Sequence, residues 1–221
     1  MFSACGSRLA MVISFSVLVG TGCASFSGNL LPKVDKIPER SDAAPRPSAK
    51  LTLQFRQFMN DTPTTLFRGS VESDWKKKII NALSESRYFS AVAEDTPNPD
   101  IIIDASVKDD GKGSMGMAVL TGLSLYLIPS FATDSFVFDA KVSSPHVSQT
   151  WEIHLEDFVT QWQQLLLFPL MPFTMSPIVA SGVQKNLLRN VVVELDRQGI
   201  LDAVAAAMNA GAAATTVAPA P

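Results

Sequence analysis

The side chains that most often carry chemistry are scarce in this chain, which has two histidines and two cysteines among 221 residues. His154 stands in the stretch EIHLED, where strand alternation puts it on one face with Glu152 and Glu156. Three such side chains could bind a metal ion or transfer a proton. Metal sites of this kind usually recruit a further histidine or thiol, and the pattern offers none. We therefore expect a solvated strand face, with no metal, no cofactor and no enzyme activity; a hydrolytic or metal-dependent enzyme would need His154.

Cys23 is the second candidate for a chemical role. Its position after an apolar N-terminal run indicates what that role is. Arg8 is the only charge before an apolar run over 9–19, which small residues follow. This layout is typical of a signal peptide and predicts that residues 1–22 are removed. The apolar run is shorter than the roughly 20 residues that a membrane-spanning helix needs. Cys5 would leave with the signal, so Cys23 would have no cysteine to pair with.

The residues Gly20-Thr21-Gly22-Cys23 resemble the lipobox of bacterial lipoproteins, with glycine at position 20 where that family usually has leucine. The resemblance implies that Cys23 becomes the mature N-terminus and carries fatty acyl chains such as palmitate. Ala24 follows the cysteine, and the absence of aspartate there implies the periplasmic face of the outer membrane. Acyl chains add roughly 0.8 kcal/mol of membrane affinity per buried methylene. The alternative is an ordinary secretory signal that leaves Cys23 as a free thiol.

Composition divides the rest of the chain. Residues 23–49 mix prolines, serines and charges with few apolar residues, which predicts a flexible tether. Residues 210–221 are of low complexity and predict a disordered tail. The segment 50–209 is long enough for one core, so we expect a single domain there. The net charge is −3 and no basic run exceeds Lys76–Lys78, which argues against nucleic acid as a partner.

Hydrophobic spacing predicts both strands and helices. Alternation predicts a strand from Leu51, a buried strand at Ile101–Ile103, and a hairpin whose strands contain 136–142 and 151–155. Helical spacing predicts one helix through about Ser86 and an amphipathic helix from about Ile178, with Gly199 at its end and a short helix after it. The expected fold is α+β, with a small mixed or antiparallel sheet, one crossing helix, a β-hairpin and a C-terminal amphipathic helix.

The pattern from Trp75 to Val92, followed by the strand at Asp100–Ile103, resembles the α/β half of periplasmic and outer-membrane lipoproteins. These include the curli-export lipoprotein and the N-terminal domain of the Tol system. The resemblance covers about 60 residues, and its pattern is hydrophobic rather than chemical. It implies a role in envelope assembly or export.

Two long runs contain no charged residue, 113–133 and 158–184. Each has the length of a membrane span. Prolines, glycines and glutamines make a helical span a poor fit for either run, because buried glutamine is costly in hydrocarbon. We expect these runs to lie mainly in the protein core. The alternative is a partly exposed patch for a partner protein or the bilayer interface, which would contain Leu165, Leu166, Phe168, Leu170, Met171 and Phe173.

These patterns together predict a lipid-anchored envelope protein that acts by binding or assembling another envelope component. Its expected partners are the membrane, through lipid on Cys23, and an envelope protein. The alternative function is a subunit of an oligomeric outer-membrane export channel or accessory ring.

Overall fold

The computed structural model describes residues 23–41, 44–66 and 68–216. It has the predicted α+β fold, in which a seven-stranded, mostly antiparallel sheet and four α-helices lie within the described residues. The predicted signal peptide, 1–22, lies outside these residues. The strands are β1 (Cys23–Ser27), β2 (Ser48–Met59), β3 (Thr62–Pro63), β4 (Ala91–Ala93), β5 (Ile101–Gly113), β6 (Ser130–Ser144) and β7 (Val147–Gln163); the helices are α2 (Arg68–Glu85), α3 (Met115–Leu123), the 3-10 helix η1 (Leu165–Phe173), α4 (Ser176–Arg197) and α5 (Ile200–Thr216).

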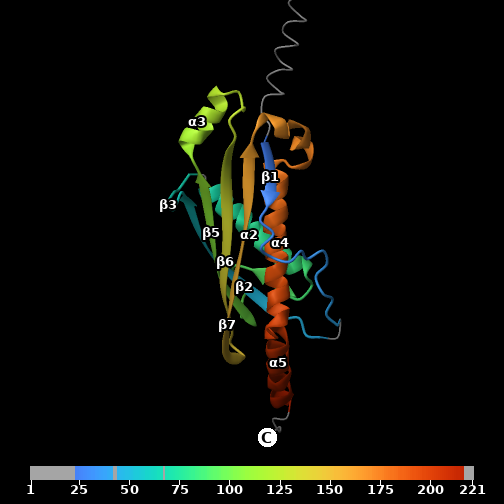
Figure 1. Cartoon of the computed structure of the whole chain (residues 1–221). Helices are drawn as coiled ribbons and strands as arrows, with labels where there is room; N and C mark the ends of the chain where they lie inside the picture. The colour runs from blue at the N-terminus through green and yellow to red at the C-terminus, as the bar shows by residue number, and fades with distance from the viewer. Residues whose placement is uncertain (1–22, 42–43, 67, 217–221) are drawn as a thin grey trace, which may run out of the picture.

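The sheet is built around three long antiparallel neighbours, β5, β6 and β7 (Figure 1). The strand order is β1-β7-β6-β5-β2-β3, with β2 parallel to β5 and the short β4 paired to β2. The predicted hairpin is confirmed as β6 and β7, which are longer than the sequence pattern indicated. These strands are long, and at their upper ends in Figure 1 the chain carries α3 on one side and η1 on the other.

Helices α2, α4 and α5 cover one face of the sheet and form the core with it. The predicted helical stripes are confirmed, since α2 buries Trp75, Ile79 and Leu83 and α4 buries Val183, Leu187, Val191 and Leu195. Each buried side chain of this size contributes about 1.5–3 kcal/mol. Gly199, with φ of 69°, ends α4 in the left-handed conformation that glycine tolerates best, and α5 follows directly.

The predicted flexible tether at 23–49 is wrong. Residues 23–27 form β1, which pairs antiparallel with β7 at the edge of the sheet. The segment 28–41, which we call the strap, then runs along α4 toward β2 (Figure 1). At its start, a Cβ on Gly28 would lie 2.5 Å from the ring of Phe158, so only glycine fits this close approach.

Polar side chains of α4 bind the backbone of the strap. Asn186 accepts from the N–H of Val34 at 2.9 Å, and Asn190 donates to the carbonyl of Pro32 at 3.0 Å. Arg189 donates to the carbonyl of Val34 at 2.9 Å. Backbone N–H and C=O groups in an extended segment outside a sheet have no secondary-structure partner. The side chains of α4 supply these partners here, whereas the composition of the segment suggests that water would.

In the segment predicted to be a disordered tail, 210–221, the structure continues α5 to Thr216. The segment is rich in alanine, which has the highest intrinsic helix propensity, and α5 starts from a buried anchor at Ile200 and Leu201. Residues 217–221 lie outside the described part of the chain.

Candidate functional site

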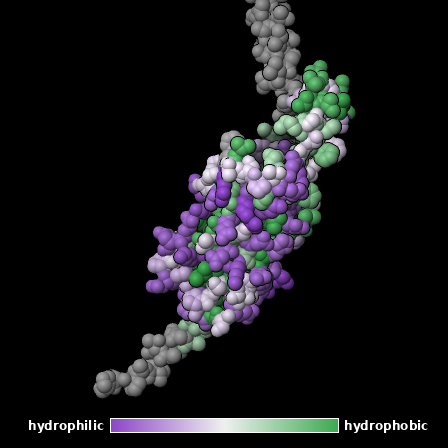
Figure 2. All heavy atoms as spheres, turned by 90° about the vertical axis from the view of Figure 1, so that its left-hand side faces the viewer, coloured by the Kyte–Doolittle hydropathy of each residue, from purple (hydrophilic) through white to green (hydrophobic). Residues whose placement is uncertain are grey.

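The two uncharged runs meet at one end of the molecule and leave their large side chains exposed. Of the twenty exposed large hydrophobic residues in the described segments, sixteen lie in these runs. Figure 2 shows part of this surface as a green cluster at the top of a largely purple and white body. We call this surface the apolar tip; it comprises Met115, Met117, Val119, Leu120, Leu123, Leu125, Leu127, Ile128, Phe131, Trp162, Leu165, Leu166, Leu170, Phe173, Met175 and Ile178.

Helix α3 forms one side of the apolar tip. Ser114 caps it by accepting from the N–H of Met117 at 3.3 Å, and β5 continues up to Gly113, so the helix begins where the sheet ends. Thr121 is its one buried residue, and the Thr121 hydroxyl donates to the carbonyl of Met117 at 2.8 Å. An apolar helix that buries a single threonine has its hydrophobic face turned away from the core.

A strained turn joins α3 to β6. Leu125 and Tyr126 have φ of 52° and 63°, a left-handed conformation that bulky residues rarely adopt. The turn is held from both sides, because the N–H of Tyr126 donates to Thr121 at 2.8 Å and the N–H of Leu165 donates to Tyr126 at 3.0 Å. Such strain persists where surrounding contacts fix it, and it concentrates at functional sites.

The 3-10 helix η1 forms the other side of the apolar tip and contains the six residues that the sequence singled out. Leu166 and Phe173 are 79% and 81% exposed, and Leu165 and Leu170 are also exposed. Phe168 and Met171 lie in the same helix, but their side chains lie outside what the structure describes. The expectation that the uncharged runs lie mainly in the core is therefore wrong. Pro169 and Pro172 prevent a regular α-helix here, which limits how the segment can fold back on the sheet.

Cys23 lies at the apolar tip. It pairs with Gln163 across β1 and β7, and the N–H of Ser25 donates to the carbonyl of Thr174, beside η1, at 2.9 Å. The thiol is half-buried, and this burial raises its pKa. The cysteine and the exposed apolar side chains therefore share one end of the fold.

Away from the apolar tip, the face of the sheet opposite the helices is largely polar. His154 lies there with Glu152 and Glu156, as predicted, and its Nδ1 is 2.6 Å from a carboxylate oxygen of Asp139 on β6. The bond to Asp139 raises the pKa of His154. Both side chains are exposed, and no cluster of three potential metal ligands occurs in the described residues. The rows of alternating acids and bases on this face suit a hydrophilic contact.

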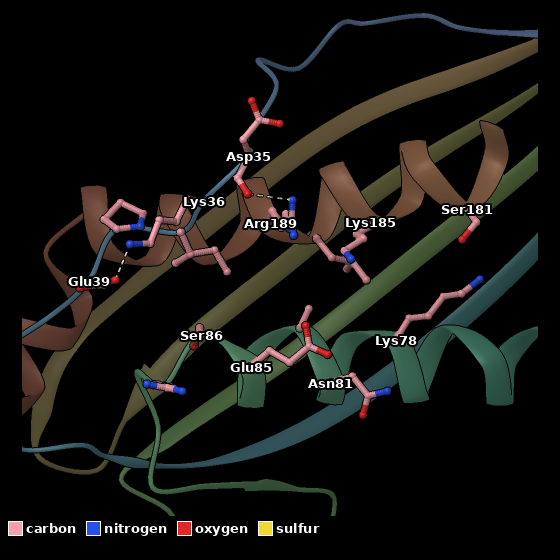
Figure 3. A pocket seen from close by; sticks show the side chains of 15 residues that line it. Asp35, Lys36, Glu39, Lys78, Asn81, Glu85, Ser86, Ser181, Lys185 and Arg189 are labelled. Atoms are coloured by element: carbon pink, nitrogen blue, oxygen red, sulfur yellow. Dashed lines mark hydrogen bonds and ion pairs between the residues drawn. The ribbon is translucent and has the colours of Figure 1, made fainter. Parts of the chain in front are cut away.

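A groove of about 570 Å³ lies between the strap, α2 and α4 (Figure 3). Its charges are largely engaged within the protein: Lys36 pairs with Glu39, Arg189 donates to the carbonyl of Asp35, and Lys78 binds Gln184. Ser86 donates to the carbonyl of Leu83. We interpret the groove as the seam between the strap and the helices.

Sequence reasoning missed two carboxylic acids on the helix-facing side, Asp109 and Asp134. Burial and the neighbouring charge of Asp134 raise the pKa of Asp109 to about 6, although a hydrogen bond from Trp75 opposes the shift. Burial also raises the pKa of Asp134. They lie in β5 and β6 between the helix-covered body and the apolar tip. In the sequence, a carboxylic acid at the end of an alternating strand looks the same whether its side chain is buried or solvated.

The chain matches no family model and no curated protein. The resemblance to curli-export and Tol-type domains therefore stays a prediction. Within the described residues, none of the helices has both the length and the hydrophobicity needed to cross a membrane.

Proposed function

We propose that this chain is a lipid-anchored protein of the bacterial envelope, on the periplasmic face of the outer membrane, that binds or assembles another envelope component. The observation that carries the proposal is the shared position of Cys23 and the apolar tip. Acyl chains on Cys23 would place the apolar tip at a membrane surface, where its exposed apolar side chains can be buried.

Strand β1 changes what such an anchor would do. A flexible tether would let the body diffuse away from the bilayer, whereas β1 joins Cys23 directly to the sheet. A lipid on Cys23 therefore fixes the orientation of the whole fold. The strands lead away from the apolar tip, so the polar sheet face and the far end of the hairpin extend into the periplasm (Figure 1). These surfaces are the ones available to a hydrophilic envelope partner.

Intact-mass analysis of the mature protein tests the anchor. We expect a chain that begins at Cys23 and carries added acyl mass. Cys23→Ser should abolish this mass, and Cys5→Ser, the matched control, should leave it unchanged because residue 5 precedes the cleavage site. A mature chain without acyl mass, or one that starts elsewhere, would refute lipid anchoring.

Site-specific photo-crosslinking in intact cells tests the binding role. A crosslinker at Gln54, exposed on the polar sheet face, should capture a discrete protein adduct. The matched position is Asn81, which is exposed on α2, on the other side of the sheet. Adducts that are equal at both positions, or absent from both, would contradict a defined binding face.

A further inference from the structure

We propose that the apolar tip is a membrane-docking surface that enters the interfacial region of the same bilayer that holds the acyl chains of Cys23. The inference rests on the proposed lipid anchor and names the occupant of the tip. It makes the bilayer, rather than a second copy or a partner protein, the ligand of this surface.

Strand register sets the depth of the tip relative to the anchor. Ala24 pairs with Trp162, and Trp162 pairs with Phe131, so three neighbouring strands bring these residues to one level. Adjacent strands are about 4.8 Å apart, and Ala24 immediately follows Cys23. A membrane that holds lipid on Cys23 must therefore reach the level of Trp162.

The chemistry of the tip fits the interface of a bilayer. The runs that form it contain no charge, so no ion has to be desolvated on entry. Tryptophan and tyrosine are typical of membrane interfaces. The tip carries Trp162, 6.2 Å from the ring of Phe131, and the half-buried Tyr126 lies in the turn beside α3. Leucine, methionine and phenylalanine fill the remaining positions, in η1 and α3.

Geometry argues against a protein as the occupant. With Cys23 acylated, the bilayer already adjoins the tip, and a partner protein would have to occupy the space between the two. Strand β1 leaves no slack that would let the body lift away, because Cys23 itself pairs with Gln163 of β7. An uncharged apolar surface that lies against hydrocarbon is stabilised there, because its burial removes apolar area from water.

Quenching of tryptophan fluorescence by lipid tests this inference. Trp162 is 42% exposed, while Trp75 and Trp151, the other two tryptophans, are buried. The purified full-length mature protein is reconstituted in zwitterionic vesicles whose phospholipids carry bromine on their acyl chains. We expect a blue-shifted emission and quenching, and Trp162→Phe should remove the quenched component. If brominated lipid leaves the emission unchanged, the proposal is refuted. This is also the result expected if a second copy of the chain, rather than the bilayer, covers the tip.

Charge substitution supplies the second measurement. Leu166→Glu combined with Phe173→Glu should remove most of the Trp162 quenching, while the melting curve stays unchanged because both side chains are exposed. The matched control, Leu66→Glu, changes an exposed leucine outside the tip and should keep the quenching. Quenching that persists in the double variant would refute the proposal.

The two proposals fail in different ways. Acyl mass on Cys23 is read by mass spectrometry, independently of where Trp162 lies. A lipidated protein without quenching would refute tip insertion alone, whereas a protein that is quenched but carries no acyl mass would refute the anchor and leave the tip as a membrane surface. Quenching should also be insensitive to salt and to anionic lipid, because the tip is uncharged.

Discussion

Strands β6 and β7 each belong to two different regions of the molecule. Between the turn of their hairpin and Phe136, their inward side chains are buried under the helices, as with Phe138 and Ile153. Beyond that level the same strands continue to the apolar tip, where Phe131 and Trp162 are exposed on the face opposite the helices. Both regions are rich in apolar residues, but only one has a protein layer to cover it. Hydrophobicity therefore does not locate the core, and the face of the sheet that the helices cover does.

Two phenylalanines of β6 give the sharpest test of this comparison. Phe138 is 1% exposed and Phe131 is 67% exposed. Phe138→Ala should lower the free energy of unfolding in solution by about 3–5 kcal/mol, because it leaves a cavity in the core. Phe131→Ala should change it by no more than about 0.5 kcal/mol. Urea denaturation of both variants measures the difference, and similar losses would show that the tip is part of the core.

The border between the two regions contains Asp109, whose raised pKa of about 6 makes stability depend on pH. The folded protein binds a proton at Asp109 at pH values where the unfolded chain has released it. This group's contribution to stability is therefore present at acid pH and is lost as the pH rises toward 6. Asp109→Asn should stabilise the protein by about 1–3 kcal/mol at pH 7.5, with a smaller gain near pH 4.

Denaturation at both pH values measures this effect. Asp104→Asn, on the exposed face of the same strand, is the control and should change stability by no more than about 0.5 kcal/mol. An Asp109→Asn variant that is less stable than the parent at pH 7.5 would contradict the burial of this carboxylate.

The strap is the third part of the comparison, since it connects the tip to the body along α4. Asn190 is buried and donates to Pro32 and to the carbonyl of Asn186. Asn190→Ala should lower the free energy of unfolding by about 1–2 kcal/mol and speed tryptic cleavage after Lys33 or Lys36. Asn81→Ala, at an exposed position of α2, is the control. Equal cleavage rates would show that α4 does not hold the strap.

The polar sheet face should respond least. His154 and Asp139 are both exposed, so His154→Ala should change stability by no more than about 0.5 kcal/mol. The variant should also leave the lipid quenching of Trp162 unchanged, because His154 lies far from Trp162 along β7. Growth and envelope phenotypes of this variant test the enzyme alternative, which requires His154.

The fold was predictable where periodicity and burial agree. Trp75, Ile79 and Leu83 on α2 and the hairpin of β6 and β7 follow directly from spacing, because one face of each element is covered by protein. The strap was not predictable, since composition cannot show that Asn186 and Asn190 satisfy backbone groups some 150 residues away. The buried Asp109 gives no local signal either.

The candidate site was predictable only in part. Charge-free runs identified the residues of the tip, including Leu166 and Phe173, but an apolar run reads the same whether protein or lipid covers it. The pairing of Ala24 with Trp162 brings the two runs to the level of Cys23, and the proposed bilayer contact rests on this observation. That register joins residues more than 130 positions apart and leaves no trace in local sequence.

Oxidative footprinting of methionines on the lipidated protein tests the central claim that the tip end faces the bilayer. Met115 lies in the tip and Met59 at the end of β2, and both are exposed in the fold. On vesicles, Met115 should be protected from a water-soluble oxidant while Met59 reacts as it does in vesicle-free protein. Equal oxidation of Met115 with and without vesicles would contradict the account.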